Sequence, residues 1–314
     1  MSEDNGSPKH ITCGKFSGHI ENVSCPICDF PPDPKLVFKS SSGIGIWLCP
    51  KCTIMYVSPR FTEKSLSQIY ESDAFIDQSF YDQWSYEKWK SENKGRSYIS
   101  QHLKIRLIKR FLTEKDRILD VGCGTGLFCL EASKQGLNVE GIDPSKMLID
   151  IGRKTFKIPL HHGPLEDFDP GYKYKGIVVW AVFEHVYGLI NLVNRCGYLL
   201  EEGGYLFIDV PHYQGVSNRF KTSLCRTGFK KDDFKHFGFP WHIYSFNKKS
   251  LSSLMRACRF DPVLFEFWSH LLKNGAKGFF ANIMISLTQK LALSDYITLV
   301  AQKKEQSRFQ KPPG

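Results

Sequence analysis

A run of residues at positions 118–126, ILDVGCGTG, constrains the fold more than any other part of this 314-residue chain. Apolar residues typical of a buried strand lead into three alternate glycines, Gly122, Gly124 and Gly126, and a segment with helical spacing follows. Because glycine has no Cβ, these positions allow a tight turn and let a ligand approach the backbone closely. The run therefore predicts a strand, a ligand-binding turn and a helix, in that order.

Two acids accompany this glycine loop. Asp120 stands two residues before the first glycine of a Gly-x-Gly-x-Gly spacing, which differs from the Gly-x-Gly-x-x-Gly of dinucleotide folds. That position is unsuited to a pyrophosphate but suits an ammonium group. Asp143 ends the next strand-like segment, VEGIDPS, where a carboxylate can hold both hydroxyls of a ribose. Together the two acids predict a single cofactor that carries both groups.

Strand-like and helical segments alternate through the rest of the chain. The segments RILDV, NVEGID, GIVVWA and YLFIDV alternate with helices expected over 126–135, 145–155 and 189–201. This alternation predicts an α/β fold with a parallel sheet covered on both faces. The polar and aromatic stretch that follows Pro211 is long for a simple connection, so we expect it to border the active site.

Four cysteines form two Cys-x-x-Cys pairs, Cys25 with Cys28 and Cys49 with Cys52. Two such pairs at this separation match the ligand spacing of a structural four-thiolate zinc site, which has no open position for a reactive water. Packed thiols and a redox pair are the alternatives, although redox pairs normally occur singly beside a βαβ unit. We therefore expect a small zinc ribbon in which Zn²⁺ has a structural role.

The motifs DVGCGTG and GIDPS resemble the first two motifs of class I S-adenosylmethionine-dependent methyltransferases. The later segments HGPLEDF, VVWAVFEHV, LLEEGGYLFIDVPH and TLVAQKK fall where that family has its adenine loop, post-strand-four segment, fifth strand and last strand. The resemblance extends from about residue 100 to 304. It implies a Rossmann-like seven-stranded sheet with helices on both faces, and S-adenosylmethionine as the cofactor.

The resemblance also implies positions for the cofactor. Met147 is placed against the adenine face, with ordinary helix packing as the alternative, and the chain at Trp180 is placed at the methionine end. Many relatives have an acid after Gly163, but this chain has Pro164, so Leu165 or Glu166 must take the adenine amino group. The predicted cofactor-binding residues are Asp120, Gly122, Cys123, Gly124, Gly126, Asp143, Met147, Leu165, Glu166 and Trp180.

Three residues are candidates for catalysis. A base is needed only if the acceptor must lose a proton, and a neutral histidine is the usual choice because its pKa lies near the working pH. His185 follows the fourth strand at the edge where ligands bind in open α/β sheets, and Glu184 is next to it and could orient it. His242 lies on the long stretch after Pro211. A helix start or packing is the alternative role for His185.

The predicted organisation has five parts: a flexible leader (1–20), the zinc ribbon (21–62), a helical connector or lid (63–110), the methyltransferase domain (111–304) and a basic tail (305–314). Aromatic residues of the connector form either a lid or a packing surface between the modules, namely Tyr81, Trp84, Tyr86 and Trp89.

The apolar stretch at 278–293 is too interrupted to span a bilayer, and we expect it to be buried against the sheet rather than to lie on a membrane. The polar N-terminus lacks the pattern of a signal peptide, so we expect a cytoplasmic protein. The formal net charge of +10 is compatible with an anionic partner, but the scattered Lys and Arg residues equally describe a solvated basic surface.

A zinc ribbon followed by a methyltransferase domain is similar to methyltransferases of glycan and deoxysugar biosynthesis. This similarity implies a small-molecule acceptor, namely a sugar, a sugar nucleotide or a glycan. Methylation of RNA is one alternative, although no interleaved run of aromatic and basic residues supports it. A non-catalytic, cofactor-binding scaffold is another, and the intact acids and glycines argue against it. The choice among O-, N- and C-methylation stays open.

Overall fold

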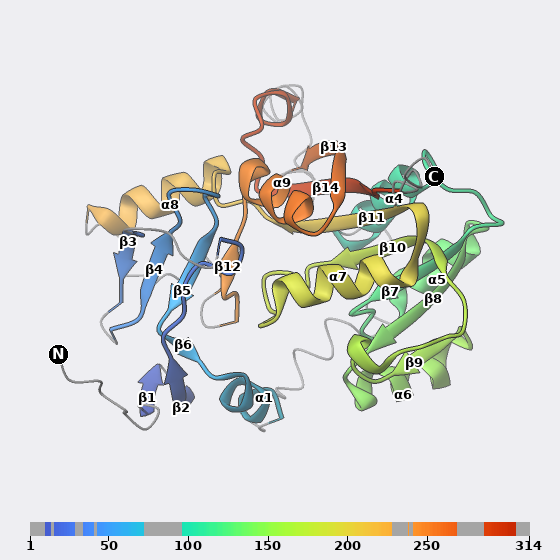
Figure 1. Cartoon of the computed structure of the whole chain (residues 1–314), viewed down its shortest axis with the longest axis horizontal. Coiled ribbons are helices and arrows are strands. Elements are labelled where there is room, and N and C mark those ends of the chain that lie inside the picture. Colours follow the sequence, from blue (N-terminus) through green and yellow to red (C-terminus); the bar gives the residue numbers. More distant parts are fainter. Residues whose placement is uncertain are drawn as a thin grey trace, which may run out of the picture.

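The structure is a computed structural model that describes residues 10–13, 16–28, 34–40, 43–71, 96–227, 238, 241–268 and 286–305. Its largest element is a seven-stranded sheet with the order β13-β14-β11-β10-β7-β8-β9 (Figure 1). The strands of this sheet are β7 (Arg117–Val121), β8 (Asn138–Asp143), β9 (Leu160–His162), β10 (Tyr174–Trp180), β11 (Leu200–Pro211), β13 (Phe260–Trp268) and β14 (Tyr296–Lys303).

Strands β7 to β11 run parallel, and β14 lies antiparallel between β11 and β13. The carboxyl ends of the parallel strands therefore meet at one edge of the sheet. The register places Trp180 of β10 beside Asp209 of β11 at this edge. The prediction of a seven-stranded α/β sheet is confirmed.

Successive residues of a strand point to opposite faces of the sheet, and in the central strands both sets are apolar. Helices therefore cover both faces. Ile118 packs in a core with α4 (Arg96–Ile108), α5 (Leu127–Lys134) and α6 (Lys146–Phe156). The next residue, Leu119, packs in a second core with α7 (Leu189–Leu199) and α9 (Lys248–Ala257). Burial on both faces is the expected environment of a parallel sheet.

The segment that holds the four cysteines (residues 21–62), called the cysteine module below, contributes three strands to a four-stranded sheet. Strands β3 (Lys35–Lys39), β4 (Gly45–Leu48) and β5 (Met55–Ser58) form antiparallel pairs. The fourth strand, β12 (Tyr244–Ser245), comes from the long stretch after Pro211 and pairs with β5. The module is therefore joined to the rest of the chain by main-chain hydrogen bonds.

The predicted flexible leader is wrong for residues 10–13 and 16–20, because β1 (His10–Cys13) pairs with β2 (Phe16–Glu21). Strand β2 also pairs with β6 (Arg60–Phe61). The His19 N–H donates to Ser65 Oγ at 2.9 Å. The hairpin is ordered by these partners more than 40 residues further along the chain, which a local pattern does not reveal.

The connector begins with α1 (Glu63–Glu71), and its predicted aromatic lid at Tyr81, Trp84, Tyr86 and Trp89 lies outside the described residues. Of the stretch at 278–293, residues 286–293 are described, and the expectation of burial is wrong for Leu287 and Leu291, whose side chains are exposed. None of the described helices is long and apolar enough to cross a membrane.

Candidate functional site

The glycine loop joins β7 to α5 in a backbone conformation that residues other than glycine rarely adopt. The φ angles of Gly122, Gly124 and Gly126 are 74°, 57° and 79°. A Cβ at Gly122 would lie 2.5 Å from Val182, and one at Gly126 would lie 2.7 Å from Leu160. A Cβ at Gly124 would meet no atom within 4 Å. Two glycines are thus required by packing as well as by φ, while the third faces open space.

Asp143 connects the two sequence motifs directly. It ends β8, and its Oδ2 accepts a hydrogen bond of 2.9 Å from the Gly124 N–H. Its Oδ1 accepts a bond of 2.8 Å from the N–H of Ser145, whose side chain caps α6. Burial raises the pKa of the Asp143 carboxyl, while these two backbone donors lower it. The carboxylate therefore holds the loop and the start of α6 in one arrangement.

Asp120 is buried below the loop. Its Oδ2 lies 3.5 Å from the Cys129 Sγ, which can donate to it. Burial raises the pKa of the Asp120 carboxyl to about 7, although the Cys129 thiol and the Lys104 ammonium lower it. The structure thus places an acid that is easily protonated beside the loop. A cation bound nearby would favour its charged form.

A cavity of about 310 Å³ opens beside the loop. Of the predicted site residues, Gly122, Leu165, Glu166 and His185 line it. Its volume falls within the range of about 300–1,000 Å³ that is typical of small-molecule sites. The residues on either side of Asp143 also line the cavity, so that both motifs border the same space.

The other predicted cofactor residues do not line this cavity. Met147 is exposed on α6. Cys123 is directed at β8, where a Cβ on Gly141 would come within 2.6 Å of its Sγ. Trp180 ends β10, and its ring lies 5.7 Å from that of Phe128. Because β10 ends at Trp180, this residue lies at the carboxyl edge of the sheet.

Helix α1, which lies in the predicted helical connector or lid, forms one wall of the cavity. Glu63, Leu66 and Ser67 line the space opposite the sheet. A helix after the cysteine module was expected, and Thr62 provides the start signal because its Oγ1 accepts a bond from the Ser65 N–H. Its position over the cavity depends on tertiary contacts and has no signal in the local sequence.

A buried ion pair lies at the carboxyl edge and was not predicted. The Lys104 ammonium of α4 is 3.0 Å from Asp209 Oδ2 and 4.7 Å from the centre of the Trp180 ring. The indole N–H of Trp268 and the hydroxyl of Thr298 donate to the other oxygen of Asp209. The pair therefore ties α4 to the edge of the sheet.

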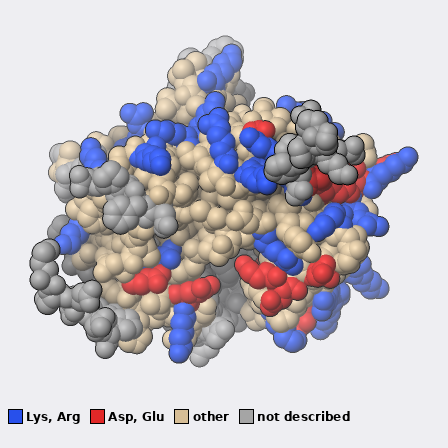
Figure 2. Space-filling view, in the orientation of Figure 1, with Lys and Arg blue, Asp and Glu red and all other residues tan. Residues whose placement is uncertain are grey.

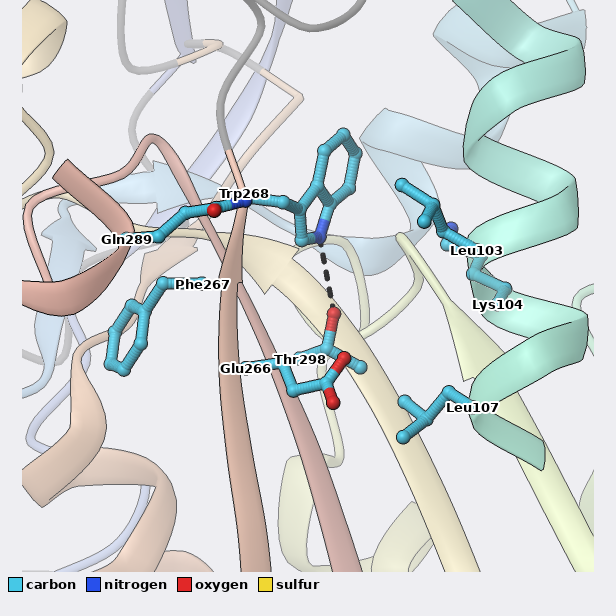
Figure 3. Close-up of a pocket in the computed structure, with 8 residues that line it drawn as sticks. All are labelled: Leu103, Lys104, Leu107, Glu266, Phe267, Trp268, Gln289 and Thr298. Atoms are coloured by element: carbon cyan, nitrogen blue, oxygen red, sulfur yellow. Dashed lines mark hydrogen bonds between the residues drawn. The ribbon is translucent and has the colours of Figure 1, made fainter. Parts of the chain in front are cut away.

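A second, smaller cavity of about 100 Å³ lies beside this ion pair. Figure 3 shows Leu103, Lys104 and Leu107 of α4 facing Trp268 and Thr298 across it. The Trp268 ring stacks on the ring of Tyr296 with centres 4.2 Å apart. The cavity thus combines an aromatic wall with a cation.

The three predicted catalytic residues lie together. The donor atoms of Glu184, His185 and His242 are all within 4.8 Å of one another, so this set could also hold a metal ion. The two imidazole rings meet edge to face, with centres 4.8 Å apart. The main-chain oxygen of Glu184 accepts a bond from the Ile243 N–H, which places the segment with His242 beside the fourth strand.

We expected Glu184 to orient His185, but in the structure Trp241 does so. His185 Nδ1 lies 3.1 Å from the main-chain oxygen of Trp241, so Nδ1 carries the proton and Nε2 is left as an acceptor. Glu184 Oε2 is buried without a hydrogen-bond partner in the described part of the chain. Burial raises the pKa of Glu184 to about 8 and lowers that of His185.

The four cysteine sulfurs gather in one cluster. The Sγ atoms of Cys25, Cys28, Cys49 and Cys52 all lie within 4.8 Å of one another. In each Cys-x-x-Cys pair, the N–H of the second cysteine points at the sulfur of the first, at 3.4 and 3.5 Å. A set of four thiolates is the donor chemistry of a structural zinc site.

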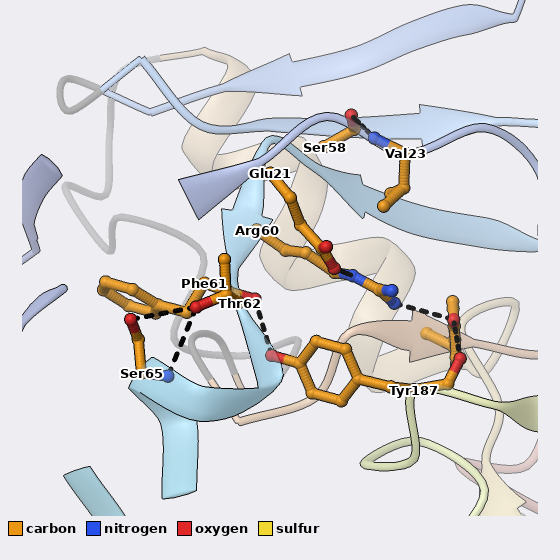
Figure 4. Close-up of polar contacts among 9 residues, drawn as sticks. Glu21, Val23, Ser58, Arg60, Phe61, Thr62, Ser65 and Tyr187 are labelled. Carbon is orange, nitrogen blue, oxygen red and sulfur yellow. Dashed lines mark hydrogen bonds and ion pairs between the residues drawn. The ribbon is translucent and has the colours of Figure 1, made fainter. Parts of the chain in front are cut away.

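Arg60 joins the cysteine module to Tyr187 and Tyr244. Its guanidinium donates to Glu21 Oε1 and to the Tyr244 hydroxyl, each at 2.8 Å, and it lies 4.2 Å from the centre of the Tyr187 ring. The Tyr187 hydroxyl donates to the Phe61 main-chain oxygen, as Figure 4 shows. Because Tyr187 lines the larger cavity, the module is joined to the wall of the candidate site.

Comparison with known proteins identifies the family. The model of the methyltransferase domain family matches residues 95–264. Ubiquinone biosynthesis O-methyltransferases are among the relatives: that of Bradyrhizobium diazoefficiens is 30% identical over 98 residues and that of a Chelativorans species 33% over 101 residues. These matches cover 30% and 29% of this chain and 39% of each relative, so the chain matches about two fifths of their length.

Solved methyltransferase structures are also among the proteins similar to this chain. A SAM-dependent methyltransferase from Thermotoga maritima is 18% identical with a TM-score of 0.47, and the match covers 70% of this chain and 95% of that one. One from Archaeoglobus fulgidus is 19% identical with a TM-score of 0.47, covering 70% and 100%. The family match extends over more than half of this chain and includes the glycine loop. The chain therefore belongs to the methyltransferase domain family.

Proposed function

We propose that this protein transfers a methyl group from S-adenosylmethionine to a hydroxyl group of a small molecule. The hydrogen bond from Gly124 to Asp143 carries the proposal, because it joins the two motifs of the family beside one cavity. The names of the O-methyltransferase relatives support a hydroxyl acceptor. A sugar, a sugar nucleotide or a glycan is the acceptor class that we favour within that group.

The residues of the glycine loop and the two acids beside it fit this cofactor. Gly124 faces open space that a side chain would fill, as expected where a ligand passes the backbone. Asp120 would neutralise the ammonium group. Each Asp143 oxygen accepts one backbone bond and has capacity for a second, from a ribose hydroxyl. We assign the cofactor to Asp120, Gly122, Cys123, Gly124, Gly126, Asp143, Met147, Leu165, Glu166 and Trp180.

When bound, the cofactor supplies a methyl group on a sulfonium, which an acceptor takes by in-line displacement. The protein contributes position and proton transfer. His185 is suited to receive the proton of a hydroxyl, because its Nδ1–H is held by Trp241 and its lowered pKa keeps Nε2 unprotonated at neutral pH. His242 packs edge-on against His185 and would keep its ring in place, with Glu184 beside them.

The smaller cavity supports an acceptor with a ring. Trp268 presents an aromatic wall near Trp180, where we place the methionine end of the cofactor. Sugar rings and other flat rings pack well on such faces. Lys104 could contact an oxygen of the acceptor only if its ammonium group binds that oxygen and Asp209 at the same time.

We also propose that the cysteine cluster binds one structural Zn²⁺ and that the ribbon spans residues 21–62. The connector at 63–110, the catalytic domain at 111–304 and the tail at 305–314 complete the proposed division. The thiolate set and the pairing of β12 with β5 support a ribbon that is folded by metal and shapes the wall of the site.

The acceptor class can be tested with labelled S-adenosylmethionine and separate pools of sugar nucleotides, phenols and RNA. We expect label in a small-molecule pool, and a loss of at least about tenfold in kcat for His185→Asn with the affinity for the cofactor retained. Transfer to RNA alone would overturn the proposed acceptor. Cofactor binding without transfer to any pool would favour the scaffold alternative.

A further inference from the structure

The two most exposed large apolar side chains of the described residues lie outside the candidate site, in neighbouring segments. Leu291 is 64% exposed and Phe220 is 63% exposed. Phe220 belongs to α8 (Val216–Arg226), and Leu291 follows the helical residues 286–290. The N–H of Val216, at the start of α8, donates to the main-chain oxygen of Leu293 at 2.8 Å. The two segments are thus in direct contact.

Each segment presents an apolar stripe to the outside. Val216 and Phe220 are four residues apart on α8, and both are exposed. Leu287 and Leu291 are also four apart and exposed, and the Leu291 N–H donates to the Leu287 oxygen as in a helix. Both segments lie along the upper edge of the molecule in Figure 1.

The other side of α8 is packed against the protein, which fixes the direction of its stripe. The hydroxyl of Ser217 donates to Asp295 at 2.7 Å, and Cys225 packs against the cluster around Ile44 and Met55 of the cysteine module. Val216 and Phe220 therefore face outward because the rest of the helix is held, not because the helix is detached.

Basic residues flank the exposed apolar ones. Arg219 and Lys221 stand on either side of Phe220, and Lys290 precedes Leu291. In the described part of the chain, none of these three cations takes part in an ion pair. Figure 2 shows many Lys and Arg side chains along the upper edge, whereas most visible Asp and Glu lie lower down.

We propose that this surface, formed by Val216, Arg219, Phe220, Leu287, Lys290 and Leu291, binds the headgroup region of an anionic phospholipid membrane. The apolar side chains enter the boundary between headgroups and acyl chains, and the cations contact the phosphates. An apolar stripe with a basic border is the combination that interfacial binding requires.

Two other occupants fit the surface less well. Single-stranded RNA binds by stacking bases on aromatic side chains, and Phe220 is the one aromatic residue among the six. A second copy of this chain, bound through the same surface by a two-fold axis, would bring Arg219 and Lys290 of both copies together. Like charges so placed repel each other.

The test is sedimentation of the full chain with vesicles of neutral phosphatidylcholine, or of phosphatidylcholine with about one third phosphatidylglycerol. We expect binding to the anionic vesicles at low salt, weaker binding at high salt, and weak or no binding to neutral vesicles. The double variant Phe220→Ser/Leu291→Ser should bind the anionic vesicles at least about tenfold more weakly.

The matched control is Ile151→Ser/Val263→Ser, which removes two apolar side chains that are 42% and 48% exposed elsewhere. It should bind like the parent protein. Absence of binding to anionic vesicles, or equal loss in the control, would overturn the proposal. The proposal would also be overturned if RNA displaced the protein from vesicles when both are present at the same phosphate concentration. The same holds if the parent protein formed concentration-dependent dimers that the double variant does not form.

Titration with S-adenosylmethionine in the same variants separates this proposal from the proposed function. Both double variants should keep the cofactor affinity and melting temperature of the parent protein, because their residues lie outside the two cavities. If the parent protein does not bind S-adenosylmethionine, the methyltransferase assignment is refuted. The vesicle result would still test the membrane proposal independently.

Discussion

The cysteine cluster and the glycine loop are both built from closely spaced residues, but they depend on the rest of the chain in different ways. The four sulfurs come from two turns within residues 25–52, and their N–H···S contacts are local. The glycine loop is held by Asp143, Val182 and Leu160, which belong to later segments of the chain.

The difference concerns what stabilises each site. A thiolate cluster can be held by its metal ion, because metal binding supplies folding free energy that a small module lacks. The glycine loop has only packing and hydrogen bonds, so its shape depends on the correct assembly of β7, β8 and β10. Removal of metal should affect the first site, and changes of packing the second.

The largest expected effect is loss of the metal. Binding of structural Zn²⁺ contributes on the order of 10–16 kcal/mol in zinc-finger peptides. We expect Cys49→Ser/Cys52→Ser to unfold the module and to lower the thermal stability of the chain, because β12 pairs with β5. Zinc content and the unfolding curve are the measurements, and Cys225→Ser is the control. A double variant with unchanged zinc content would contradict the assignment.

The next effect concerns the charge of Asp120. Its pKa is raised from about 3.8 to about 7 by burial, so the stability that it contributes is complete below pH 4 and is lost as the pH rises to 7. This pH-dependent part of the unfolding free energy amounts to about 4 kcal/mol or less. Asp120→Asn should abolish this part of the pH dependence of the unfolding free energy in cofactor-free protein. An unchanged profile would show that folding does not shift the pKa of Asp120.

A smaller effect separates packing from φ within the loop. Gly126→Ala should destabilise the protein by about 2–4 kcal/mol, because its Cβ would lie 2.7 Å from Leu160 in addition to the strain of a positive φ. Gly124→Ala should lower stability by only about 1 kcal/mol. It should nevertheless weaken cofactor binding, because its Cβ points into open space. Denaturant unfolding and calorimetry distinguish the two; equal destabilisation would be evidence against this account.

The smallest effect is expected between the module and the cavity wall. Glu21 is more than a third exposed, so its ion pair with Arg60 contributes at most about 1 kcal/mol. Glu21→Gln should leave the melting temperature within a few degrees of the parent value. A larger change would mean that the two regions are coupled more strongly than their contacts suggest.

The sequence predicts the glycine loop, both acids and the cysteine cluster because each is defined by spacing within a few residues. The ion pair of Lys104 with Asp209 escapes prediction because its partners are about a hundred residues apart and each looks ordinary alone. The contact of His185 with Trp241 is missed for the same reason, and the neighbour Glu184 is the more obvious but incorrect choice.

The hairpin of β1 and β2 shows a different limit. Gly18 and Ile20 do not form a long alternating pattern, and β2 is ordered by its pairing with β6. The wall formed by Leu66 of α1 likewise depends on how the module sits on the domain. Predictions from spacing are therefore strongest where one strand or turn carries the whole site.

The most direct test of the central claim is titration calorimetry of the full chain with S-adenosylmethionine at neutral pH, in parallel with Asp143→Ala. We expect one binding site per chain in the parent protein and an affinity at least about tenfold lower in the variant, since Asp143 holds the loop and is assigned to the ribose. A folded parent protein that gives no binding heat at any temperature tested, or a variant with unchanged affinity, would contradict the assignment of the cofactor to this loop.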